Sequence, residues 1–201
     1  MKKKYIIFDL DWTLISSHKN INKLIFEYFK EKDPDYYDKV RYKLDFNKIS
    51  NIQELLKEVY QEKNSKIKHK EIYDYLDSHN HKNNFLEWTI EKILELKNNY
   101  KLYLSTWSST KFANEILEKW WVKKYFELIQ WSDIIPKSEV HLDIFEEHSW
   151  DENFFEKSIS IWDSMRDELF AKNRNIDFIK IWDKSPSASW SYKNISEIKN
   201  I

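Results

Sequence analysis

Four aspartates in this chain stand in two pairs whose spacing could support phosphate chemistry. Asp9 and Asp11 directly follow one short apolar run, and Asp163 and Asp167 follow another. Carboxylates packed close together repel one another and raise one another's pKa unless a divalent cation neutralises them. Ligation by oxygen atoms alone suits Mg²⁺. These residues therefore predict a magnesium site beside which a phosphate could bind.

Hydroxyl and ammonium groups occupy comparable places after other apolar runs. Ser105 and Thr106 close one such run, and Lys137 follows another. Such groups can donate hydrogen bonds to phosphoryl oxygens, where charge is stabilised during phosphoryl transfer. Ser105 is a rival to Thr106, and Lys124 and Lys184 are rivals to Lys137. Each residue alone has an ordinary explanation as a turn or surface residue, so only the combination is specific.

Short apolar segments alternate with helix-length segments over most of the chain. The predicted strands are 5–8, 102–104, 126–129, 158–161 and 178–181. The predicted helices between them include 89–98, 110–119 and 164–174. This alternation predicts an α/β fold with a Rossmann-like parallel sheet and helices on both faces. Ligands of such sheets bind at the carboxyl ends of the strands, where the residues above are placed.

One long segment interrupts the alternation. Residues 16–84 contain no convincing strand but show helical periodicity over 21–29 and again over 52–60. We therefore predict a helical domain at 16–84, inserted into a core domain made of 1–15 and 85–201.

The motifs resemble, in order, those of the haloacid dehalogenase superfamily of phosphohydrolases. Residues 9–13, Asp-Leu-Asp-Trp-Thr, are similar to the first motif, Asp-x-Asp-Gly-Thr. Residues 102–106 are similar to the second motif, Lys137 to the third, and residues 162–167 to the fourth, Gly-Asp-x-x-x-Asp. The chain lacks the prolines that usually follow the third-motif lysine. The insertion resembles the C1 cap of phosphoglycolate-phosphatase-like members.

The resemblance implies a role for each matching residue. Asp9 would be the nucleophile, and Asp11 would protonate the leaving oxygen and then take a proton from water. Thr106 and Lys137 would bind the phosphate of the substrate. The implied cofactor is Mg²⁺, and its implied ligands are Asp9, Asp11 through its backbone carbonyl, Asp163 and Asp167.

The function predicted from this resemblance is Mg²⁺-dependent cleavage of a small phosphomonoester through an aspartyl-phosphate intermediate. A phosphosugar mutase that uses the same intermediate is an alternative, and so is phosphonate cleavage with an imine-forming lysine of the cap. A non-catalytic binding protein becomes an alternative if Trp12 and Trp162 are genuine. The cap sequence does not identify the substrate, although phosphoglycolate-like compounds are a reasonable first trial.

The chain contains ten tryptophans and no glycine. At an average usage of about 7%, a chain of this length would hold roughly 14 glycines. Most of the tryptophans end an apolar run or precede a helical pattern, where turns call for glycine. Two of them, Trp12 and Trp162, stand in the glycine positions of the motifs. We hypothesise that UGA has been read as tryptophan in a chain whose source reads it as glycine, as some bacterial lineages do. A genuinely tryptophan-rich protein is the alternative.

Composition narrows the class of protein further. A chain of 201 residues that is 41% hydrophobic can bury a sizeable core, and its net charge of −1 does not suit a nucleic-acid partner. It has no cysteine for a disulfide and no apolar run long enough to span a membrane. A cytoplasmic protein acting on a small phosphorylated metabolite is expected, and no protein partner can be inferred. The histidines, His141 and His148 among them, are expected at the surface.

Overall fold

The computed structural model describes residues 2–15, 21–35, 37–38, 69–79, 84–132, 135, 137–181 and 190–198. Contacts divide the chain into two compact units. The first consists of Met1–Ser16 with Asn83–Ile201, and the second is Ser17–Lys82.

The first unit is built on a parallel sheet of six strands in the order β3-β2-β1-β4-β5-β6. The strands are β1 (Tyr5–Phe8), β2 (Lys101–Thr106), β3 (Phe126–Trp131), β4 (Ser158–Trp162), β5 (Asp177–Ile181) and β6 (Trp190–Tyr192). The predicted parallel sheet is confirmed, and all five predicted strands are present. The short edge strand β6 was not predicted.

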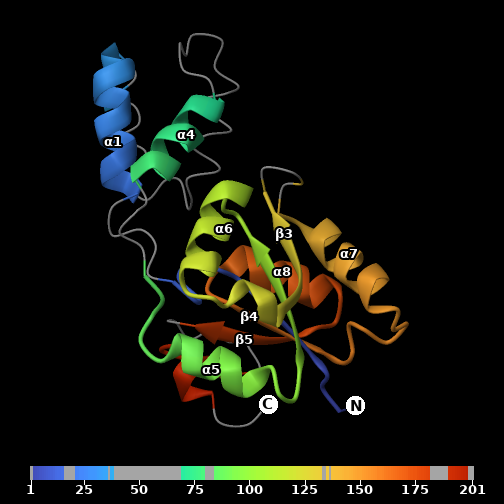
Figure 1. Ribbon diagram of the computed structural model, residues 1–201. Coiled ribbons are helices and arrows are strands. Elements are labelled where there is room, and N and C mark those ends of the chain that lie inside the picture. Colours follow the sequence, from blue (N-terminus) through green and yellow to red (C-terminus); the bar gives the residue numbers. More distant parts are fainter. Residues whose placement is uncertain are drawn as a thin grey trace. The chain divides into compact units, whose positions relative to one another are not determined.

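Two apolar cores cover the two faces of this sheet, because successive side chains of a strand point to opposite faces. Ile6 and Phe8 of β1 belong to one core, and Tyr5 and Ile7 belong to the other. The first core also contains residues of α5 (Thr89–Leu96) and α6 (Thr110–Lys119), and the second contains residues of α7 (Glu139–Ser149) and α8 (Met165–Asn173). Figure 1 accordingly shows α6 and α7 on opposite sides of β3.

Serine side chains define where three of these helices begin. The hydroxyls of Ser109, Ser138 and Ser164 accept hydrogen bonds from backbone N–H groups in the first turns of α6, α7 and α8. This capping satisfies donors that have no partner within the helix. Among the described residues of this unit, three of the four α-helices match predicted segments, with α6 at its predicted bounds, whereas α7 was not predicted. Two short 3₁₀ helices, η1 (Lys123–Tyr125) and η2 (Ile195–Glu197), complete the described elements of this unit.

The second unit contains α1 (Ile21–Lys32) and α4 (His69–His79), which pack against each other. The ring centroids of Tyr28 and Tyr75 lie 4.9 Å apart, and Phe29 and Ile72 are fully buried. The first predicted helix of the insertion is therefore present, while the predicted helix at 52–60 lies outside the described residues. Within the described parts of the chain, no helix is long and apolar enough to cross a membrane.

The chain leaves and re-enters the first unit at neighbouring points. Ile15 forms an isolated parallel bridge with Asp11 and an antiparallel bridge with Phe85. Leu86 also donates a backbone hydrogen bond to Leu14 at 2.9 Å. The segment around Ile15 that leaves the core and the segment around Phe85 that returns to it are thus paired with each other.

Candidate active site

The sheet order brings three predicted site segments together. β1 lies between β2 and β4, and Phe8 is in register with Leu104 on one side and Ile161 on the other. The residue that follows, Asp9, donates its backbone N–H to the carbonyl of Ile161 at 3.1 Å. The carboxyl ends of three adjacent strands therefore meet around Asp9, at the point in such folds where ligands bind.

Lys137 reaches this point and forms two buried ion pairs. Its Nζ atom lies 2.8 Å from Oδ1 of Asp9 and 3.1 Å from Oδ1 of Asp167. Burial opposes the charge on Lys137, but the nearby Asp167 and Asp9 outweigh this effect and raise the pKa of the lysine. Lys137 is therefore a charged donor within the cluster of acids. Its rival Lys124 is exposed and lies over the ring of Tyr125, while Lys184 lies outside the described residues.

Three of the predicted metal ligands form one cluster. Asp9, Asp163 and Asp167 each offer a carboxylate oxygen, and these atoms all lie within 4.8 Å of one another. Burial, and then repulsion by Asp167, raise the pKa of Asp163 to about 6, against a partial opposing effect of Lys137. Burial also raises the pKa of Asp9 well above its usual range. Since one lysine does not balance these acids, their close-packed oxygens fit a hard divalent cation such as Mg²⁺.

The carboxylate of Asp11 lies apart from this cluster, against hydroxyl groups. Its Oδ2 atom accepts hydrogen bonds from Ser108 at 2.7 Å and from Thr106 at 3.4 Å. From the sequence, Asp11 is predicted to bind the metal through its backbone carbonyl and to transfer protons through this carboxylate. Ser108 was not predicted from the sequence, because its position depends on the path of the loop after β2.

Thr106 and its rival Ser105 point to different partners. The Thr106 hydroxyl meets Asp11 and also accepts a hydrogen bond from the backbone N–H of Ser108 at 3.0 Å. The Ser105 hydroxyl instead lies 2.8 Å from Nδ1 of His141. Of the two, Thr106 is the residue that lies against a predicted catalytic acid.

His141 is buried, so the expectation of a surface histidine was wrong for this residue. It lies in the first turn of α7 and contacts Ser105 and the carbonyl of Ile135. Because both ring nitrogens have polar partners, burial leaves no unsatisfied group. His148, further along the same helix, is exposed as expected.

Asp167 is held by the residue that begins α8. The Ser164 hydroxyl donates to Oδ2 of Asp167 at 2.8 Å and accepts the backbone N–H of the same residue at 3.2 Å. One serine thus caps the helix and orients an acid of the cluster. The sequence shows Ser164 between the two fourth-motif aspartates but does not by itself reveal this role.

Two tryptophans flank the site. Trp162 is 1% exposed, and the centroid of its indole lies 4.9 Å from Nζ of Lys137. Its indole N–H is buried with no hydrogen-bond partner. Trp12 directly follows Asp11 and has φ of 59°.

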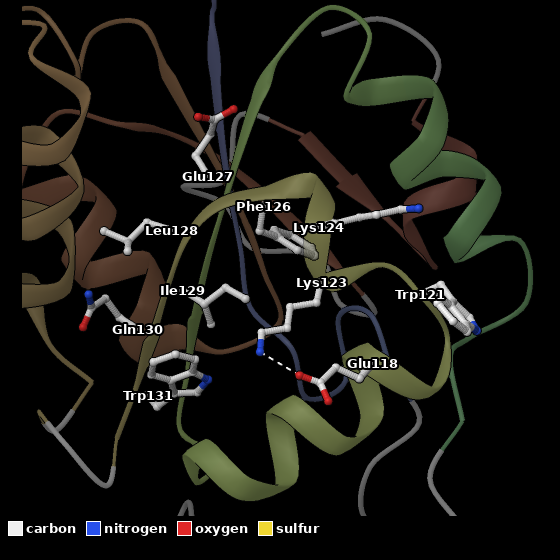
Figure 2. Close-up of a pocket in the computed structure, with 10 residues that line it drawn as sticks. All are labelled: Glu118, Trp121, Lys123, Lys124, Phe126, Glu127, Leu128, Ile129, Gln130 and Trp131. Carbon is white, nitrogen blue, oxygen red and sulfur yellow. Dashed lines mark hydrogen bonds and ion pairs between the residues drawn. The ribbon is translucent and has the colours of Figure 1, made fainter.

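A separate groove of about 940 Å³ runs along the edge strand β3. Figure 2 shows the side chains that line it, with an ion pair of 2.8 Å between Lys123 and Glu118 at one side. None of the predicted site residues contributes to the groove. Two of its lining residues, Trp121 and Trp131, are tryptophans, so its shape depends on their identity.

Comparison with known proteins identifies the family of this chain. Residues 6–181 match the family model of haloacid dehalogenase-like hydrolases. The chain belongs to the haloacid dehalogenase-like hydrolase family. The resemblance and the enzyme class predicted from the sequence motifs are therefore confirmed at the level of this family. No match was found among curated proteins.

Solved structures of other haloacid dehalogenase-like proteins share the fold over almost the whole chain. A family hydrolase from Streptococcus pneumoniae is 21% identical, with a TM-score of 0.71 and coverage of 97% of this chain and 96% of that one. CbbY from Rhodobacter sphaeroides, solved in complex with phosphate, is 15% identical, with a TM-score of 0.72 and the same coverage. A protein from Lactobacillus plantarum assigned as a phosphoglycolate phosphatase is 16% identical, with a TM-score of 0.69 and 98% coverage of each chain.

Proposed function

We propose that this protein is a Mg²⁺-dependent phosphatase that cleaves a small phosphomonoester through an aspartyl-phosphate on Asp9. The observation that carries the proposal is the buried contact of 2.8 Å between Lys137 and Asp9, within a cluster that also holds Asp163 and Asp167. A nucleophile, a phosphate-binding cation and two further acids would then act on one phosphoryl group.

In the first step, a carboxylate oxygen of Asp9 attacks phosphorus in line with the leaving oxygen. The bond between phosphorus and the leaving oxygen breaks as the new bond to Asp9 forms, and Asp11 gives its proton to the leaving oxygen. In the second step, water attacks the same phosphorus and passes a proton to Asp11. The bond to Asp9 breaks, inorganic phosphate leaves, and both acids return to their starting states.

The remaining residues would stabilise charge and hold geometry. Lys137 and Thr106 would donate to phosphoryl oxygens, and Ser108 would orient the Asp11 carboxylate that it already contacts at 2.7 Å. Asp9, Asp163 and Asp167 would hold Mg²⁺, which when bound would offset negative charge on the phosphoryl oxygens. Ser164 would keep Asp167 in place.

The substrate class we propose is a small phosphorylated metabolite, with phosphoglycolate-like compounds first. Two structural relatives support this choice, since one is assigned as a phosphoglycolate phosphatase and another was solved with phosphate. We propose that Ser17–Lys82 acts as the cap that selects the leaving group. The cysteine-free composition is in keeping with a cytoplasmic location.

A panel of phosphomonoesters with Mg²⁺ tests the proposal. We expect phosphate release that stops with a chelator and that Asp9→Asn reduces to background. Full turnover by Asp9→Asn would overturn the covalent mechanism. With a sugar phosphate, isomerised product in place of free phosphate would indicate a mutase.

A further inference from the structure

Four tryptophans occupy a backbone conformation that suits glycine. The φ angles of Trp12, Trp88, Trp121 and Trp150 are 59°, 60°, 58° and 54°. In this left-handed region the Cβ atom crowds the following carbonyl oxygen, so bulky residues are uncommon there. Among the described residues, one other has a positive φ, Asn175 at 55°. Asparagine is one of the few residues besides glycine that tolerates this region.

The ends of α6 and α8 have the same backbone conformation but differ in the residue that adopts the left-handed position. After α6, Val122 donates to the carbonyl of Leu117 and Trp121 donates to that of Glu118, both at 3.0 Å. After α8, the corresponding bonds run from Ile176 to Ala171 at 2.9 Å and from Asn175 to Lys172 at 3.1 Å. Both are Schellman motifs, whose left-handed residue is usually glycine and sometimes asparagine. The same left-handed backbone position is therefore occupied by asparagine after α8 and by tryptophan after α6.

The exposure and the hydrogen bonding of several tryptophan side chains are unusual for this residue type. Trp88, Trp121 and Trp150 are 61%, 78% and 92% exposed, so most of each indole is left in water. The indole N–H groups of the half-buried Trp131 and the fully buried Trp162 are themselves buried and have no hydrogen-bond partner. A buried donor without an acceptor is destabilising, and indoles in native cores usually find one.

We propose that the protein made by its source carries glycine at the tryptophan positions, because that source reads UGA as glycine. A single codon reassignment accounts for the absence of glycine, for the four left-handed tryptophans and for tryptophan in two glycine positions of the family motifs. It places glycine directly after Asp11 and directly before Asp163. The inference stands on backbone geometry and composition and does not depend on the proposed activity.

Peptide mass spectrometry of the protein isolated from its source tests this directly. The peptides that contain positions 12, 88, 121 and 150 should have the masses expected for glycine, and the gene should carry UGA at all ten positions. Tryptophan masses, or UGG codons, would overturn the proposal.

Thermal unfolding of three single variants tests the backbone argument separately. Trp150 is the best position because its exposed indole contributes little packing. Trp150→Gly should raise Tm by roughly 1–4 °C, because glycine relieves the left-handed strain. Trp150→Ala keeps a Cβ and should give little of this gain, and Asn175→Gly should change Tm little. An equal gain in the alanine and glycine variants, or no gain in either, would contradict the argument.

Ser132 links Lys137 to β2. Its hydroxyl donates to the carbonyl of Thr106 at 2.8 Å and accepts the backbone N–H of Lys137 at 3.1 Å. The backbone of the phosphate-binding lysine is thereby linked through one serine to the strand that ends in Thr106.

His141 makes a second link between the same two elements. The Ile135 carbonyl lies 2.7 Å from Nε2 and can only accept, so Nε2 carries the proton. Nδ1 is then the acceptor for the Ser105 hydroxyl at 2.8 Å. The neutral ring therefore connects the end of β2, through Ser105, to the residue two positions before Lys137.

We infer that His141 is a positioning residue for Lys137, an inference that rests on the proposed phosphatase function. The hydrogen bonds of the ring go to Ser105 and Ile135 and not to the three acids of the cluster. The ring acts on the lysine by fixing Ile135, two positions before it in the sequence, against the end of β2. Loss of this link should move the ammonium relative to the phosphate and leave the metal-binding acids in place.

Kinetics of three variants test this role. His141→Leu removes both hydrogen bonds, whereas His141→Gln keeps a donor for Ile135, and His148→Leu is the control on the same helix. His141→Leu should weaken inhibition by inorganic phosphate and raise KM by about 10- to 100-fold, with the Mg²⁺ concentration for half-maximal activity unchanged. His141→Gln should recover part of the loss, and His148→Leu should match the parent.

The outcomes separate the two hypotheses. An active parent with an unchanged His141→Leu variant would overturn the positioning role alone, as would an equal loss of phosphate and Mg²⁺ binding. A parent that neither releases phosphate nor is found by calorimetry to bind inorganic phosphate would overturn the proposed function, and the positioning role with it.

Discussion

The ammonium group of Lys137 lies 2.8 Å from a carboxylate oxygen of Asp9, although 128 positions separate the two residues in the chain. Both side chains are at most 3% exposed, so the pair is sealed from water. The contact depends on the strand order, which sets the segment after β3 near the end of the central strand β1. The predicted effects of replacing Lys137 follow from this contact.

Replacing this lysine should affect both stability and activity. Lys137→Met leaves Asp9 and Asp167 as buried acids without their cation, which is expected to reduce the free energy of unfolding by about 3–5 kcal/mol at neutral pH. If the residue also binds phosphate, kcat/KM should fall by about 100- to 1,000-fold. Urea unfolding and phosphate release measure the two effects. The exposed Lys124→Met is the control and should change the free energy of unfolding by no more than about 0.5 kcal/mol.

The loss of Asp11 should depend on the leaving group. Asp11→Asn cannot transfer a proton, so kcat for an alkyl phosphate is expected to fall by about 100- to 10,000-fold. An aryl phosphate whose leaving oxygen needs no proton should lose much less in the first step. Rates for the two substrates, with the exposed Asp35→Asn as a control, measure this difference. Equal losses for both substrates would argue against Asp11 as the proton donor to the leaving oxygen.

Asp163 should make the metal-free protein less stable as pH rises from about 4 to about 6. Burial and repulsion by Asp167 raise the pKa of Asp163 to about 6 from 3.8, so in this range the folded state keeps a proton that the unfolded state has released. The contribution to the free energy of unfolding is up to roughly 3 kcal/mol and is lost towards neutral pH. Urea unfolding in a chelator should show a smaller decline for Asp163→Asn than for the parent.

Added Mg²⁺ should reverse this effect. A cation binds the ionised carboxylates, so it should stabilise the parent more at pH about 7 than at pH about 5. At a concentration of 100 times its Kd at the higher pH, the free energy of unfolding should rise by about 2.7 kcal/mol. Asp163→Asn should lose most of this gain. If the free energy of unfolding of the parent does not change on addition of Mg²⁺ at any pH, the metal site is refuted.

Two helix caps offer a matched pair for testing Ser164. Ser164→Ala and Ser109→Ala each remove a serine cap, and each should lower the free energy of unfolding by about 0.5–2 kcal/mol. Only Ser164 also donates to Asp167, at 2.8 Å. Ser164→Ala alone should therefore raise the Mg²⁺ concentration needed for half-maximal activity. A similar shift in the Ser109→Ala variant would mean that the effect comes from a general loss of stability and not from the contact with Asp167.

The sequence predicted the parts of this fold that depend on regular patterns. A buried parallel strand such as 5–8 is a continuous apolar run, and residues directly after such strands must lie at one edge of the sheet. Asp9, Thr106 and Asp163 could be placed by this rule. α7 was not predicted, because its inward face consists of His141, Leu142 and Phe145 and so gives little apolar periodicity in the sequence.

The supporting residues could not be predicted in the same way. Ser108, Ser132 and Ser164 act through hydrogen bonds that depend on the path of a loop or the start of a helix. A serine in sequence looks the same whether it caps a helix, orients an acid or faces water. His141 became recognisable only when Ser105 and the Ile135 carbonyl were seen on either side of its ring.

The bridge between Ile15 and Phe85 has a consequence for how this protein could change. Because the outgoing and returning segments are paired with each other at the core, we expect that the insertion between them could be replaced without unfolding the core. Another insertion, or a short engineered loop, could then stand in place of Ser17–Lys82 while the acids and Lys137 keep their positions in the core. If the insertion selects the leaving group as proposed, a change of substrate would then require a different insertion and no change in the catalytic core.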